Sequence, residues 1–176
     1  MHNFREIRKQ IIKTLKEKRN KKRRQRENLR MERFIEKQKI YHSVALKELS
    51  QGLKQTHWMW FVFPQLKGLG SSYNANYYGL DDAEEAKKYW ENDYLRNNYL
   101  ELCAILLNLQ EGSASKIFGF PDDLKLKSSL TLFYLVTKDE VVEKTLQRFF
   151  GLELDDFTVK ALKNNFKKEI NKRWER

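Results

Sequence analysis

One stretch decides the fold: Pro121-Asp-Asp-Leu-Lys-Leu-Lys-Ser-Ser-Leu-Thr-Leu-Phe-Tyr-Leu-Val136. A proline followed by two aspartates favours the first turn of a helix, and neither glycine nor a further proline interrupts the residues that follow. A surface helix carries its apolar residues on one side, whereas the apolar residues of this stretch fall on most sides of a helix. The sequence therefore predicts a helix that begins at Pro121 and runs through the middle of a helical body.

Helices are also predicted on both sides of this stretch. The first glycine of the chain is Gly52 and the first proline is Pro64, so nothing in residues 3–51 interrupts one long helix or two helices end to end. No segment alternates apolar and polar residues over the length of a strand. We therefore predict an all-α fold whose other helices cover residues 71–79, 81–90, 94–109, 113–118, 140–150 and 158–174.

The charge of the chain is distributed unevenly. Charged residues make up 34% of the 176 residues, above the usual quarter. Residues 1–31 hold thirteen Lys or Arg and three Glu, while the remaining 145 residues hold 22 basic and 21 acidic residues. We therefore predict two parts: a basic helical arm of residues 1–30 and one compact all-α domain of residues 31–176.

The arm has an apolar beginning and a strongly cationic middle. Apolar residues stop at Leu15, and the segment Lys16–Arg26 has none. Like charges crowded into about three helical turns favour a polyanion such as RNA, bound with little sequence preference. A solvated helix without a partner and an anionic membrane surface are the alternatives. The residues predicted to contact nucleic acid are Lys18, Arg19, Lys21, Lys22, Arg23, Arg24 and Arg26.

Cysteine usage and hydropathy favour an intracellular, reducing location, and we expect the cytoplasm. Cys103 is alone, so it cannot form an internal disulfide, and no Cys/His cluster has zinc-ligand spacing. No run approaches the roughly 18 apolar residues that cross a bilayer, so no integral membrane contact, metal or cofactor is expected. The Arg-rich, acid-poor start leaves mitochondrial targeting open.

A first motif lies at His57-Trp-Met-Trp-Phe-Val-Phe-Pro-Gln-Leu-Lys-Gly-Leu-Gly-Ser-Ser-Tyr-Asn-Ala-Asn-Tyr-Tyr-Gly79. It places a lysine and two glycines just before a helix start, where unpaired N–H groups favour an anion such as phosphate. The order of residues is not that of a Walker A loop. Alternatively, the glycines only form a tight turn and a serine caps the helix. The candidate ligand-binding residues are Trp58, Trp60, Gln65, Lys67, Gly68, Gly70, Ser71 and Ser72.

The second motif is the start of the central helix. Asp122, Lys125 and Ser129 lie about one turn apart on one face. Charges on a central helix must be paired or lie in a pocket, because burying an unpaired charge costs several kcal/mol. Either Asp122 and Asp123 cap the helix and Asp122 pairs with Lys125, or Asp123, Lys125 and Ser129 line a cleft opposite the glycine loop. Trp58 and Trp60 would then wall this cleft.

Such a cleft would suit a nucleotide-like ligand. An indole face can stack on a base or nicotinamide ring, loop amides and Lys67 can bind phosphate, and a carboxylate can bind ribose hydroxyls. An ADP-ribose or NAD-type compound uses all three. If the domain is an enzyme, which the sequence does not decide, the candidates are Asp123 or Asp122 as base, Lys125 as its partner and His57. Otherwise His57 fixes the following turn and the tryptophans belong to the core.

Three groups of residues together resemble domain-of-unknown-function family 1810, a mainly bacterial family. The first group is Arg33-Phe34 with Gln38, Tyr41 and Ala45-Leu46; the second is His57–Gly70 with Tyr78-Gly79; the third is Ile117–Phe133. The resemblance covers about residues 32–162. The basic arm is a departure, because typical members lack one. The resemblance implies a compact helical fold and no particular activity.

Overall fold

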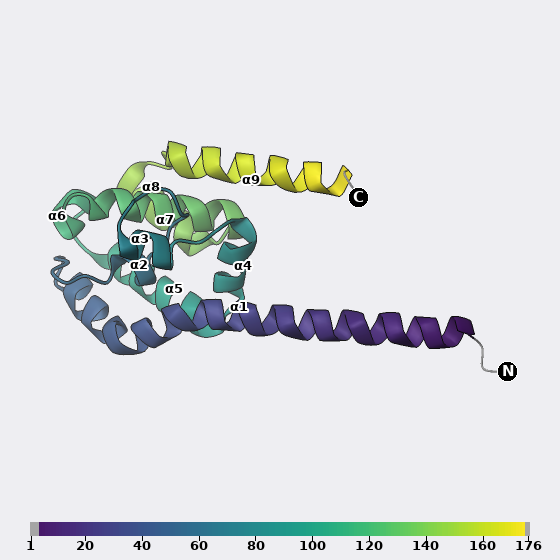
Figure 1. Ribbon diagram of the computed structural model, residues 1–176. Coiled ribbons are helices and arrows are strands. Elements are labelled where there is room, and N and C mark those ends of the chain that lie inside the picture. Colours follow the sequence, from purple (N-terminus) through teal and green to yellow (C-terminus); the bar gives the residue numbers. More distant parts are fainter. Residues whose placement is uncertain (1–3, 175–176) are drawn as a thin grey trace. The chain divides into compact units, whose positions relative to one another are not determined.

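The computed structural model describes residues 4–174, without the side chains of Arg23, Arg24 and residues 168–174. Over these residues every regular element is a helix, so the predicted all-α fold and its long N-terminal helix are confirmed. The helices are α1 (Phe4–Ser50), α2 (Met59–Val62), α3 (Tyr73–Tyr78), α4 (Ala83–Glu91), α5 (Asp93–Asn108), α6 (Ala114–Phe118), α7 (Asp122–Thr137), α8 (Glu140–Phe150) and α9 (Asp156–Trp174) (Figure 1).

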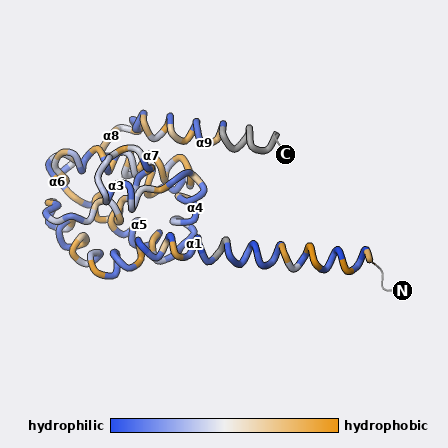
Figure 2. The backbone as a smooth tube through the Cα atoms, in the orientation of Figure 1, coloured by the Kyte–Doolittle hydropathy of each residue, from blue (hydrophilic) through white to orange (hydrophobic). Residues whose placement is uncertain are grey.

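The chain forms two units, Met1–Arg33 and Phe34–Arg176, each described here by itself. In the first unit, the described part of α1 from residue 4 to 22 is exposed along its whole length. Figure 2 shows its hydrophilic middle and the apolar residues near its start. None of the described helices is both long enough and apolar enough to cross a membrane. The predicted boundary between residues 30 and 31 stays a prediction.

In the second unit, α7 is the central helix. It packs against α4, α6, α8 and α9. Leu126, Leu130 and Phe133 have no exposed surface. The Phe133 ring lies 5.3 Å from that of Tyr89 and 4.9 Å from that of Tyr99, centroid to centroid. Burial of apolar side chains on all sides of α7 explains why its sequence has no polar face after the first two turns.

Most of the shorter helices begin within about two residues of the predicted starts, and each of these starts is capped by a polar side chain. An oxygen of each capping side chain accepts a hydrogen bond from a backbone N–H of the first turn, which stabilises a helix by about 1 kcal/mol. The caps are Ser72 for α3, Asp82 for α4, Asn92 for α5, Ser113 for α6 and Asp139 for α8. The single turn α2 was not predicted, because four residues are too few to show a period.

A buried amide holds the first motif in place. The Gln38 side chain, on the second half of α1, donates to the Phe61 carbonyl at 2.6 Å and to the Tyr89 hydroxyl at 2.8 Å. Its oxygen accepts from Asn98 Nδ2 at 3.0 Å. Only 1% of Gln38 is exposed, so each of these bonds replaces one that water would otherwise make. One glutamine thus joins α1 to α2, α4 and α5.

Candidate functional site

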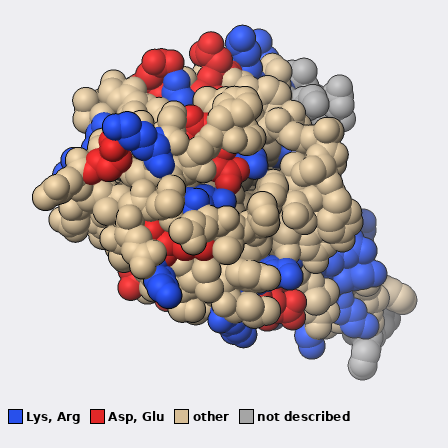
Figure 3. All heavy atoms as spheres, turned by 90° about the vertical axis from the view of Figure 1, so that its left-hand side faces the viewer, with Lys and Arg blue, Asp and Glu red and all other residues tan. Residues whose placement is uncertain are grey.

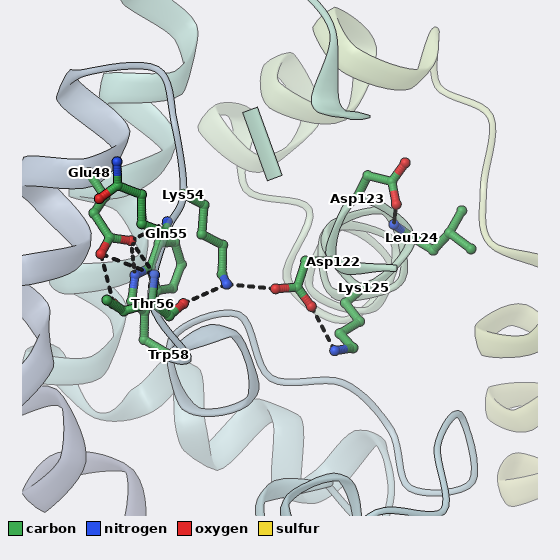
Figure 4. Close-up of polar contacts among 9 residues, drawn as sticks. All are labelled: Glu48, Lys54, Gln55, Thr56, Trp58, Asp122, Asp123, Leu124 and Lys125. Carbon is green, nitrogen blue, oxygen red and sulfur yellow. Dashed lines mark hydrogen bonds and ion pairs between the residues drawn. The ribbon is translucent and has the colours of Figure 1, made fainter. Parts of the chain in front are cut away.

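The two sequence motifs meet at the start of α7. The Asp122 carboxylate forms ion pairs with Lys54 Nζ and with Lys125 Nζ, each at 2.6 Å (Figure 4). Lys125 Nζ also lies 4.4 Å from the centroid of the Trp60 ring, a distance at which an ammonium is attracted to the ring face. Residues from α2, the loop before it and α7 therefore form one cluster, which we call the Asp122 cluster: Lys54, Trp60, Asp122 and Lys125.

The Asp122 cluster is partly open. The side chain of Lys54 is 5% exposed, that of Asp122 17% and that of Lys125 22%. Burial by itself would raise the pKa of Asp122, but hydrogen bonds and charge from Lys125 and Lys54 hold this pKa below its ordinary value of 3.8. The carboxylate is therefore ionised at neutral pH, where it orients two ammonium groups and is a weak base.

Glu48 forms a second, closed cluster beside the first. Its carboxylate accepts hydrogen bonds from Gln55 N at 2.9 Å, Thr56 Oγ1 at 2.7 Å and Trp58 Nε1 at 2.8 Å (Figure 4). The residue is 5% exposed. Burial raises the pKa of Glu48, yet the hydrogen bonds outweigh it and leave the pKa below its ordinary value. Lys54 Nζ, which donates to the Thr56 carbonyl at 2.6 Å, joins this cluster to the Asp122 cluster.

The glycine loop is fixed by backbone bonds. Lys67 N donates to the Leu80 carbonyl at 2.9 Å, and Leu80 N donates to the Gln65 carbonyl at 2.8 Å. Gly68 has a φ of +98°, which side chains rarely allow, and a Cβ here would lie 3.2 Å from the Phe157 ring. The predicted tight turn therefore has a geometric basis at Gly68.

Other groups of this loop already have intramolecular partners. Lys67 pairs with Asp81 while 41% of the lysine side chain stays exposed. Ser72 accepts a hydrogen bond from Ala75 N at 3.1 Å and caps α3. Ser71 is exposed. An incoming anion would therefore have to compete with Asp81 for Lys67.

A small cavity of about 10 Å³ lies beneath the loop. Gln65 Nε2 is buried, and it has no hydrogen-bond partner among the described residues. The cavity has room for about one water molecule, which could accept from this amide. A nucleotide does not fit inside and would have to bind on the surface outside. The lining residues are Trp60, Gln65, Leu66, Leu69, Gly70, Ala75, Tyr78 and Gly79.

The remaining candidates lie apart from the surface between Trp60 and Lys125, although Lys54 Nζ lies 5.0 Å from the centroid of the Trp58 ring. Asp123 accepts a hydrogen bond from Ser115 Oγ at 2.6 Å, on the side of α6, and His57 is exposed. Ser129 and Trp58 have no exposed surface; the Ser129 hydroxyl lies 3.1 Å from that of Tyr99. Because Ser129 and Trp58 lie in the core, they do not border an open cleft, and we leave both out of the proposed site.

Sequence reasoning missed Glu48 and Lys54. Glu48 lies on the buried face of α1 beside Ala45 and Leu49, and an acid at such a position was a signal that it has buried partners. Lys54 gave no signal, since a lysine in a loop is ordinarily solvated. On the face that includes α6, acidic and basic side chains lie next to one another, as expected for paired charges (Figure 3).

On α1, the cationic residues predicted to bind nucleic acid are exposed where the structure describes them. Those described are Lys18, Arg19, Lys21, Lys22 and Arg26; the side chains of Arg23 and Arg24 lie outside the described part. A shallow recess of about 510 Å³ runs beside this part of α1 and is lined by Lys16, Arg19, Asn20, Lys22 and Arg26. Four of its five lining residues are cations, so it favours an anion.

Comparison with known proteins gives a family and a fold. The family model described as "Protein of unknown function (DUF1810)" matches residues 28–162. The crystal structure of the conserved hypothetical protein Rv1873 from Mycobacterium tuberculosis is similar, with 41% sequence identity and a TM-score of 0.73. The match covers 75% of this chain and 95% of that one. No curated protein matches the chain.

Proposed function

Because this chain belongs to the DUF1810 family, which has no described activity to transfer, we propose a function from its own side chains: the domain binds a small anionic, nucleotide-like ligand over Trp60 and Lys125. One observation carries the proposal. The Lys125 ammonium is held between Asp122 and the Trp60 ring, and the Lys125 side chain is 22% exposed, so a phosphate would meet an oriented cation beside an aromatic surface.

The phosphate and the base of such a ligand each have a partner at this surface. An ammonium has three N–H donors, and one bond to Asp122 leaves donors of Lys125 for a phosphate. Trp60 offers an aromatic ring for a base. Lys67 and Ser71, at the surface of the glycine loop, can contact a second phosphate. ADP-ribose or an NAD-type compound supplies all of these groups.

Neither Asp122 nor Asp123 is well placed for a catalytic role at this surface. Asp122 is paired with two lysines and its pKa is lowered, which makes it a weak proton acceptor. Asp123 contacts Ser115 rather than a cation. His57 is exposed. Binding is therefore the primary proposal and catalysis a secondary one.

Calorimetric titration of the full chain with ADP-ribose tests the proposal. Lys125→Met should weaken binding at least tenfold, because it removes the oriented ammonium. Lys127→Met is a matched control, since Lys127 lies on the same helix and pairs with Glu153 at 2.6 Å instead. The proposal fails if ADP-ribose does not bind, or if both lysine variants lose the same affinity.

A second candidate function is supported by the exposed cations of α1. Residues 1–27 lie before the family match, so whatever this segment binds is additional to the family's domain. Nucleic acid fits the run of cations best, since phosphates release counterions on binding and need no shaped pocket. The arm would then carry the domain to RNA or a similar polyanion.

Salt-dependent binding of a short single-stranded RNA tests this candidate. In the full chain, Arg19→Gln, Lys22→Gln and Arg26→Gln together should weaken binding and reduce the slope of log K against log salt by about 2. A control that removes three other cations, Lys37→Gln, Lys39→Gln and Lys47→Gln, should change the slope far less. Equal effects of the two triple variants would contradict binding through the arm.

A further inference from the structure

An apolar groove lies on the second unit, away from the Asp122 cluster. It has a volume of about 480 Å³ and is bordered by the start of α4, the end of α7 and the first half of α9. Its apolar lining residues are Ala83, Leu135, Val136, Leu154, Val159, Leu162 and Phe166, and its polar ones are Glu84, Lys87, Lys163 and Asn165. Three segments far apart in the sequence thus form one hollow.

The groove results from the way α9 lies against α7. Val159, Leu162 and Phe166 recur at helical spacing, so they form one apolar face of α9. That face does not close over α7 completely, because Leu135, Val136 and Leu162 stay partly exposed and Phe166 is 65% exposed. Apolar surface left in water is unfavourable, so this groove favours an apolar occupant.

The polar residues at the rim select the charge of the occupant. Lys87 comes from α4 and Lys163 from α9, and neither has a carboxylate partner within 4 Å among the described residues. Glu84 is the one acid among the lining residues. An occupant with an apolar body and one anionic end therefore complements the groove better than a neutral or cationic one.

Size decides between a small molecule and a protein partner. A volume of about 480 Å³ lies within the range of small-molecule sites. Val159, Leu162 and Phe166 stand at i, i+3 and i+7, so a partner helix is the alternative occupant. Two turns of a helix about 10–12 Å wide take up more space than about 480 Å³, so the volume favours the small molecule.

From these observations we infer that the α4–α7–α9 groove binds a free medium-chain fatty carboxylate, with its chain on Val136, Val159 and Leu162 and its head beside Lys87 or Lys163. No covalent step is involved. Transfer of a methylene from water to an apolar site makes binding about fourfold tighter. Affinity should therefore rise steeply with chain length.

Titration of the full chain with decanoate, followed by ¹H–¹⁵N NMR, tests the inference. Shifts should concentrate in residues 83–87, 135–136 and 154–166. Octanoate, which is two methylenes shorter, should bind about fifteenfold more weakly than decanoate. Decyltrimethylammonium, with the same tail and the opposite charge, should also bind more weakly. Phe166→Asp, at an exposed position that leaves folding intact, should reduce decanoate affinity at least fivefold.

The controls separate this groove from the cations of α1. Arg19→Gln with Lys22→Gln should leave decanoate affinity unchanged, whereas Lys87→Gln with Lys163→Gln should lower it about tenfold. Shifts confined to residues 4–30 would overturn the inference, because decanoate would then be bound by the arm. Equal affinity for octanoate and decanoate, or no binding at millimolar decanoate, would overturn it as well.

Discussion

Glu48, which is buried, and Asp122, which is partly buried, are carboxylates joined through Lys54, and they have opposite kinds of partners. Glu48 accepts from neutral groups, which are backbone amides, a hydroxyl and an indole. Asp122 accepts from two ammonium groups, one of which reaches the surface beside Trp60. A carboxylate whose acceptor sites are filled by neutral donors can only hold the fold together. One that positions a partly exposed cation can also prepare a binding surface.

The largest effect on stability is expected from Glu48→Ala. The substitution leaves the buried Trp58 indole N–H and two partly buried backbone amides without an acceptor, and a buried unpaired group costs about 1–3 kcal/mol. We expect the free energy of unfolding to fall by about 3 kcal/mol, measured by urea denaturation. A loss below about 1 kcal/mol would show that water replaces the carboxylate, and Glu48 would not be a structural centre.

Asp122→Asn should have the next largest effect on stability. Lys54, whose side chain is 5% exposed, would keep its charge without a counterion, at a cost of about 2 kcal/mol. The double variant Asp122→Asn with Lys54→Met should recover most of that loss, because it removes the unpaired charge as well. Additive losses in the double variant, measured by the same denaturation, would contradict the pairing.

Acid should destabilise the fold through both carboxylates. Their folded-state pKa values are lowered from 4.5 for Glu48 and 3.8 for Asp122, so the unfolded chain binds protons first. The stabilisation is therefore complete above about pH 4.5 and is lost as the pH falls through the lowered pKa values. Unfolding midpoints measured between pH 6 and pH 2 should fall, and Glu48→Gln should flatten this dependence. An unchanged dependence in that variant would contradict the lowered pKa of Glu48.

Lys125→Met should have the smallest effect on stability. The side chain is 22% exposed, and Asp122 keeps Lys54 as a partner, so we expect a loss of no more than about 1 kcal/mol. Ligand binding should suffer far more than stability. A loss as large as that of Glu48→Ala would place Lys125 with the structural residues and remove the contrast between the clusters.

The helices were predictable because their signals are local. Capping residues such as Ser72 and Asp139 mark helix starts, and the apolar residues on all sides of α7 mark a central helix. The meeting of Trp60 with Lys125 was expected in outline, since charges on a central helix need partners. The contacts of Glu48 reach residues 7 to 10 positions away, and the Lys54–Asp122 pair spans 68 positions, which no local pattern encodes.

The site itself was predictable only in part. The sequence could not show that Ser129 and Trp58 turn inward, because a serine on α7 and a tryptophan in an aromatic run suit a core and a cleft equally well. Nor could it give the size of the cavity beneath the glycine loop. The size of the cavity depends on how closely Gly70 approaches Ala75. A Cβ added to Gly70 would lie only 3.0 Å from the Cβ of Ala75.

The most direct test uses two of the four tryptophans, Trp58 and Trp60, as internal reporters. In a ¹H–¹⁵N spectrum of the full chain, the indole signals are assigned by Trp58→Phe and Trp60→Phe, and ADP-ribose is then added. We predict that the Trp60 indole signal shifts as ADP-ribose is added, until the site is saturated. The Trp58 signal should stay in place, because Trp58 Nε1 donates to Glu48 at 2.8 Å. If the Trp60 signal does not move, or moves no more than that of Trp58, the Asp122 cluster is not a ligand site.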